Sequence, residues 1–227
     1  MIDDMWAGVR ERVLRLAEHP RADKVFGAKG HGFRLGPVMG EEQLQALEAD
    51  LGVGLPAQYR SFLLRVGGGG AGPYYGLMTP TLNDGRWQWL GIGLAYPGQP
   101  TTAEFAGRPF VAEALQSEIA AMEAQEPTLE AFASDDEFRH AYTAWDARYE
   151  ELNDAREAGA VFLSEQGCGY ASLIVMTGPH RGAIWEDLRP TDGGIVSTGH
   201  DFAHWYRSWL ERTEQQLDFT PPAPTHQ

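Results

Sequence analysis

The sequence predicts an α+β fold, a single domain in which a mixed, mostly antiparallel sheet is flanked by helices. Helix-like and strand-like segments follow each other in the order helices, strands, helices, strands, helix. The strand-like segments cluster and are joined by short turns, which favours antiparallel pairing over alternating βαβ units. The 227 residues, 43% of them hydrophobic, are enough to bury a sizeable core. We expect the domain to span residues 1–217 and residues 218–227, with three prolines, to form a flexible tail.

The N-terminal part is predicted to be helical. Apolar residues recur at helical spacing over residues 3–18, and His19-Pro20 ends that pattern. Residues 21–32 read as a loop, and Phe33 and Leu35 alternate with polar neighbours as in a short strand.

Two further helices are delimited by glycine and proline. Leu44, Leu47 and Leu51 share one face of a helix over residues 41–51, which Gly52 closes. Pro56 then opens a third helix, because proline's missing N–H costs nothing at the first helical position.

Strands and turns follow from about residue 73 to residue 94, with a turn at Asn83-Asp84-Gly85. Residues 95–109 are rich in Pro, Gly and Thr and are expected to form a loop.

A helical insert is predicted over about 109–158, with helices at 109–124 and 135–157. The second helix carries an aromatic stripe spaced by 4, 3, 4 and 3 residues: Phe138, Tyr142, Trp145, Tyr149 and Leu152. We predict that this stripe belongs to the core, the alternative being a ligand box.

The C-terminal part is predicted to hold three strands and a helix. The strands are Val161–Leu163, Ala171–Thr177 and Ala183–Asp187, joined by Gly-rich turns. Asp201 is placed to cap a last helix that runs to about Leu217.

Charge narrows the class of partner. The net charge is −14, and residues 111–160 contribute −10 of it, with thirteen acids against three bases. Nucleic acids and anionic membranes are poor partners for such a chain, because both attract positive surfaces. The single cysteine allows no internal disulfide, the N-terminus has no secretory pattern, and no apolar run approaches about 18 residues. We therefore expect a cytoplasmic protein.

Two segments carry a family resemblance. Residues 41–77 read EEQLQALEADLGVGLPAQYRSFLLRVGGGGAGPYYGL, and residues 162–209 contain LSEQGCGYASLIVMTGPHRGAIWEDLRPTDGGI and DFAHWYRSWL. In order and spacing these signatures resemble the SUKH superfamily, the family of the yeast cell-wall-synthesis regulators and of many bacterial immunity proteins.

The resemblance implies a non-enzymatic scaffold without cofactor or metal. For a bacterial member it implies neutralising a cognate toxin, often a nuclease, by direct binding. The negative charge of the chain further predicts a basic toxin, because opposite electrostatic potentials speed the encounter of two proteins. The alternative is an intracellular adaptor or regulatory module, as the yeast relatives suggest.

The residues we predict to contact a partner are exposed aromatic side chains and acids. Trp87 and Trp89 share one face of a strand, so they form either an aromatic patch or part of the core. The predicted contact residues are Tyr74, Tyr75, Trp87, Trp89, Asp135, Asp136, Glu137, Glu150, Glu151 and Asp187.

The sequence gives little support for phosphate binding, catalysis or metal binding. Gly67–Gly70 lacks the Lys and Ser/Thr of a phosphate loop and is expected to end a helix. Cys168 has no base placed beside it by any signature. His200 and His204 stand at i, i+4 without a third ligand. Glu186-Asp187 are neighbours on a strand and point to opposite faces, so they do not converge for acid–base work.

Overall fold

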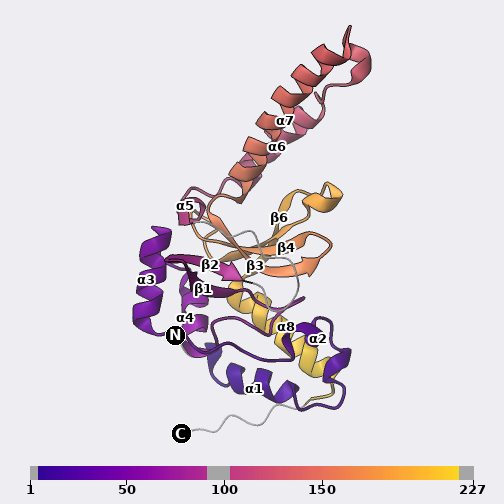
Figure 1. The fold of residues 1–227 in the computed structure, drawn as a ribbon. Coiled ribbons are helices and arrows are strands. Elements are labelled where there is room, and N and C mark those ends of the chain that lie inside the picture. The colour runs from indigo at the N-terminus through magenta and orange to yellow at the C-terminus, as the bar shows by residue number, and fades with distance from the viewer. Residues whose placement is uncertain (1–4, 91–102, 220–227) are drawn as a thin grey trace.

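The computed structural model describes residues 5–90 and 103–219, and its fold is α+β, as predicted (Figure 1). Every strand pair in these residues is antiparallel, so the sheets are not mixed. Most of the predicted loop 95–109 and of the predicted tail 218–227 lies outside the described residues. None of the helices in the described part combines the length and apolar character needed to cross a membrane.

The N-terminal helices are α1 (Val9–Leu16), η2 (Ala22–Lys24) and α2 (Ala28–His31). Helix α1 is shorter than the predicted helix 3–18, because Gly8 adopts a left-handed φ of 68° directly before it. The loop predicted at 21–32 instead contains η2 and α2. The predicted strand at Phe33 and Leu35 is reduced to one isolated bridge from Leu35 to Gly70.

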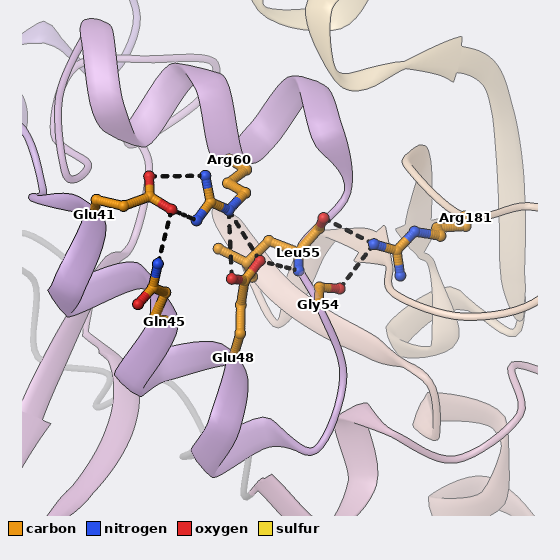
Figure 2. A network of polar contacts seen from close by, with 7 residues as sticks. All are labelled: Glu41, Gln45, Glu48, Gly54, Leu55, Arg60 and Arg181. Carbon is orange, nitrogen blue, oxygen red and sulfur yellow. Dashed lines mark hydrogen bonds and ion pairs between the residues drawn. The ribbon is translucent and has the colours of Figure 1, made fainter.

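Helices α3 (Glu41–Leu51) and α4 (Ala57–Arg65) have nearly the predicted bounds. Figure 2 shows the polar network that fastens them to each other and to the sheet. Arg60 of α4 pairs with Glu41 and Glu48 of α3, and Glu48 also accepts the Leu55 N–H. Arg181, from the loop before the fifth strand, donates to the backbone carbonyls of residues 54 and 55. The turn between α3 and α4 is therefore held from both sides.

A two-stranded hairpin follows, made of β1 (Thr79–Asn83) and β2 (Arg86–Leu90). Its register pairs Asn83 with Arg86, so the loop is Asp84-Gly85, and both loop residues have positive φ. That is the geometry of a type I′ hairpin turn, and it confirms the predicted turn.

The main sheet has four strands in the order β3-β4-β5-β6: β3 (Ala160–Gly167), β4 (Tyr170–Val175), β5 (Ala183–Asp187) and β6 (Ile195–Asp201). The sequence pattern missed β6, whose second half is polar and exposed. Helix α8 (Phe202–Gln216) follows at once, and Asp201 caps it by accepting the His204 N–H, as predicted.

The sheet is buried on both faces. One face, with Val161, Leu163 and Ile184, joins the main core, to which α1, α3, α4 and α8 also contribute. The other face packs Trp185 and Val175 in a smaller cluster with Phe110 and Ala112. The extent of the domain over residues 1–217 stays a prediction.

The predicted helical insert forms a projecting hairpin. After α5 (Ala103–Ala106), helix α6 (Ala112–Glu123), η3 (Leu129–Ala131) and helix α7 (Asp135–Glu157) form an antiparallel pair that extends away from the sheet, at the end opposite α1 (Figure 1). We call residues 112–157 the arm.

Candidate protein-interaction surfaces

The arm concentrates the negative charge of the molecule in one place. Twelve of the thirteen acids between residues 111 and 160 are exposed, and Glu157 at the base is half-buried. Three acidic side chains open α7, where the positive end of the helix dipole stabilises them. These are the predicted contact residues Asp135, Asp136 and Glu137, and Ser134 caps the same helix end by accepting the Glu137 N–H.

The predicted aromatic stripe lies along the arm and outside both core clusters. Its rings contact each other in series, with centroid separations of 5.7 Å, 5.6 Å and 5.0 Å from Phe138 to Tyr142, Trp145 and Tyr149. Phe132 extends the series at the tip, 6.0 Å from Phe138. We call these five rings the ladder.

The ladder forms the seam with α6 and also reaches solvent. Trp145 Nε1 donates to the Met122 carbonyl, and the Tyr149 hydroxyl donates to Glu123. All five rings are only half-buried, and of the predicted stripe Leu152 alone is fully buried. The prediction that the whole stripe belongs to the core was wrong. Helix α7 packs against the single helix α6 and not against a sheet, so one side of the stripe stays uncovered.

Ion pairs use only some of the arm's carboxylates. Arg148 pairs with Glu118 and Glu151, and Arg139 pairs with Asp136. A second acidic row on α7, formed by Asp146, Glu150 and Asp154 at successive i, i+4 positions, is exposed. Within the described residues this row makes no ion pair. The predicted contact residue Glu150 is therefore free for a partner, whereas Glu151 is already paired.

The base of the arm is tied to the sheet through Arg189. Its guanidinium bonds Asp187 of β5 and Glu157 of α7. Burial lowers the pKa of Arg189, but the hydrogen bond to Asp187 and the charge of Glu157 outweigh it, so the pKa is raised. Asp187 is only 3% exposed. The prediction that Asp187 contacts a partner was wrong, because its carboxylate is buried and bonded to Arg189.

A cleft on the body of the molecule contains the predicted residue Tyr74. Its hydroxyl donates to Glu186 of β5 at 3.0 Å. Burial, and next the charge of Glu186, raise the pKa of Tyr74 to about 12, so the hydroxyl keeps its proton. The cleft has a volume of about 600 Å³ between Phe26, β5, β6 and one side of α8, where Trp205 and Arg212 line it. We call it the α8 cleft.

Tyr75, the next predicted residue, lies beside this cleft. It is half-buried, and its ring stacks at a tilt on Phe26, 5.1 Å between centroids. Phe26 is itself 59% exposed. Sequence reasoning missed Phe26, because a single aromatic residue in a Gly- and Lys-containing loop carries no periodic signal.

Trp87 and Trp89 do not form a surface patch. They are 8% and 0% exposed, and Trp89 Nε1 donates to the buried Tyr59 hydroxyl at 2.9 Å. The interpretation in which both belong to the core describes them, and they are withdrawn as contact residues. Strand alternation placed them on one face correctly but could not tell which face was covered.

The predicted contact residues thus fall into separate regions. Tyr74 and Tyr75 border the α8 cleft, while the five acids Asp135, Asp136, Glu137, Glu150 and Glu151 lie on the arm, beyond the far edge of the sheet (Figure 1).

Cys168, His200 and His204 are the residues considered above for catalysis or metal binding. Cys168 is exposed in the turn between β3 and β4. The rings of His200 and His204 lie 4.4 Å apart. Among the residues the structure describes, no group of three or more His, Cys, Asp or Glu is placed to hold a metal ion.

This α+β scaffold, with its antiparallel sheet between helices, is accompanied by a family match. The model of the SMI1 / KNR4 family (SUKH-1) matches residues 39–209. The chain therefore belongs to the SMI1/KNR4 family, within the SUKH group that the sequence resembles. Searches of curated proteins and of solved structures found no match to it.

Proposed function

We propose that this chain is a non-enzymatic immunity protein that binds a cognate toxin directly and neutralises it in the cytoplasm. Membership of the SMI1/KNR4 family supports a toxin-immunity or SMI1/KNR4-like regulatory role in general. The observation that carries the immunity role is the arm, where exposed carboxylates are concentrated on a hairpin that projects from a body with its own core.

The arm's negative charge favours a basic protein as the partner. A nuclease toxin needs positive charge to hold its substrate, and exposed carboxylates attract that charge. Opposite potentials raise the association rate, and the gain is lost in salt because the Debye length falls from about 30 Å at 0.01 M to about 10 Å at 0.1 M.

The test uses the protein encoded by the gene adjacent to this one. The C-terminal domain of that protein is expressed in a sensitive host with and without this chain, and growth is recorded; a domain that is harmless by itself favours the adaptor. Restored growth, together with an association rate that falls at least tenfold between low and physiological salt, supports the proposal. Growth arrest despite abundant folded chain, or a rate that salt leaves unchanged, contradicts it.

The alternative is an intracellular adaptor or regulatory module, which the α8 cleft favours. Its aromatic and charged lining gives the body a contact surface that does not depend on the arm. An adaptor would bind a housekeeping protein and leave the growth of toxin-expressing cells unchanged.

A further inference from the structure

The ladder is an incompletely covered aromatic face on a helix pair. Helix α6 covers one side of the rings, and the half-buried rings from Phe132 to Tyr149 reach solvent on the other. Leu129 at the tip is 50% exposed. Trp and Tyr are among the side chains most enriched at the positions that anchor protein interfaces.

The size of the face is sufficient for a specific interface. Helix α7 has 23 residues and is therefore about 34 Å long, and two packed helices are about 20 Å wide. In projection, one face of the arm thus covers roughly 700 Å², the same order as the roughly 800 Å² of accessible surface that each partner buries in a standard interface.

The ladder and its flank favour cations in the partner. An arginine or lysine can lie over the face of Trp145 or Tyr142 by a cation–π contact. The exposed Asp146 is one residue from Trp145 and four from Tyr142 on the same helix, and the exposed Glu150 is one residue from Tyr149. The guanidinium of a partner arginine that lies over one of these rings would therefore have a carboxylate beside it.

The linear charge density of the arm is close to that of a nucleic acid strand. A net charge of −10 over residues 111–160, spread along about 34 Å, is one charge per about 3.4 Å. One strand of a nucleic acid carries one charge per about 3.4 Å of axis. Grooves that hold single strands combine cations with aromatic platforms, and the arm presents the complement of both.

We propose that the arm docks through the ladder into the nucleic-acid-binding groove of a basic partner protein and occupies the place of one nucleic acid strand. This proposal rests on the proposed function and adds to it the surface, the anchors and the mode of inhibition, which is exclusion of the substrate.

The experiment uses the catalytically inactivated toxic domain from the adjacent gene and two fluorescein-labelled 12-nucleotide single strands, one DNA and one RNA. We expect the domain to bind at least one strand and the wild-type chain to displace it in a competitive manner. Trp145→Ala should weaken binding of the chain by roughly thirtyfold, as expected for an interface anchor.

Charge reversal gives a second variant that leaves the ladder intact. Asp146→Lys with Glu150→Lys should weaken binding at least tenfold and flatten its salt dependence. The matched control is Glu11→Lys with Glu18→Lys on the opposite end of the molecule, which makes the same change in net charge at exposed sites. Circular dichroism checks that each variant is folded.

The outcomes separate the arm proposal from the proposed function. If the chain and a strand bind the domain together, or if the domain binds neither strand, substitution for nucleic acid is wrong. If the arm variants bind as tightly as the wild type, docking through the arm is wrong, and weaker binding of Phe26→Ala would then place docking at the α8 cleft. In those cases the proposed function stands, provided the wild type binds. If the wild-type chain does not bind the domain, the proposed function fails and the arm proposal fails with it.

Discussion

Protonation of His31 should make the stability of the fold depend on pH. The imidazole of this last residue of α2 is fully buried and packs edge-on against Phe33 and Trp209. Nδ1 accepts the Phe33 N–H at 3.0 Å, whereas Nε2 has no hydrogen-bond partner in the described residues. Burial, and next the charge of Arg34, lower the pKa of His31 to about 4.

The sign and size follow from linkage. The folded state keeps this histidine neutral down to a pH of about 4, while the unfolded chain takes up a proton below its ordinary pKa of about 6.5. Lowering the pH from about 6.5 to about 4 therefore favours unfolding. A difference of about 2.5 pKa units corresponds to about 3 kcal/mol of stability, present above pH 6.5 and lost at about pH 4.

The assay is urea unfolding at several pH values between 7.5 and 4.5, for the wild type and for His31→Asn. The amide oxygen of asparagine can accept the Phe33 N–H but takes up no proton, so the variant loses stability by a constant amount. Carboxylates titrate alike in both proteins, so the difference between the two curves isolates His31. Parallel curves over this range would refute the reasoning.

Four further substitutions, one of them a control, probe other parts of the fold by the same unfolding assay. Tyr59→Phe should cost about 1–3 kcal/mol, because the buried Trp89 N–H loses its acceptor, and an unchanged stability would contradict this. Gly159→Ala should destabilise by several kcal/mol, since its φ is 75° and a Cβ would lie 2.5 Å from a carbonyl oxygen, whereas Gly178→Ala at a φ of 72° in open space should cost about 1–2 kcal/mol. Arg189→Met should cost about 3–5 kcal/mol by leaving a buried carboxylate unpaired, and a loss below 1 kcal/mol would show that the pair is dispensable.

The elements that the sequence predicted well are those fixed by local chemistry. Gly52 has the left-handed φ of 65° that ends α3, and Pro56 stands directly before α4, where its fixed φ suits a helix start. Asp84-Gly85 makes the hairpin turn and Asp201 caps α8. In each case the residue acts within a few positions of its own, so its effect can be read without the rest of the fold.

The elements that the sequence missed depend on distant contacts. Strand β6 is polar at its outer end, and its pairing with β5 holds it in the sheet. Asp187 was predicted to face a partner and is buried against Arg189. Trp87 and Trp89 were correctly placed on one face, but the helices that cover this face come from elsewhere in the chain. Periodicity tells which side chains share a face and not what lies opposite.

The ladder is a further case in which periodicity did not tell what lies opposite a face, and here the answer bears on function. A stripe of apolar side chains every three or four residues satisfies a helix in a core and a helix at an interface equally well. Here the stripe lies along an arm whose outer part adds no residue to either core cluster, while the main core is complete in the body. The five half-buried rings pack α7 against α6 but belong to neither core cluster, and the carboxylates in the row beside them repel one another. An aromatic face flanked by carboxylates is the surface that the proposed docking of the arm on a basic partner requires.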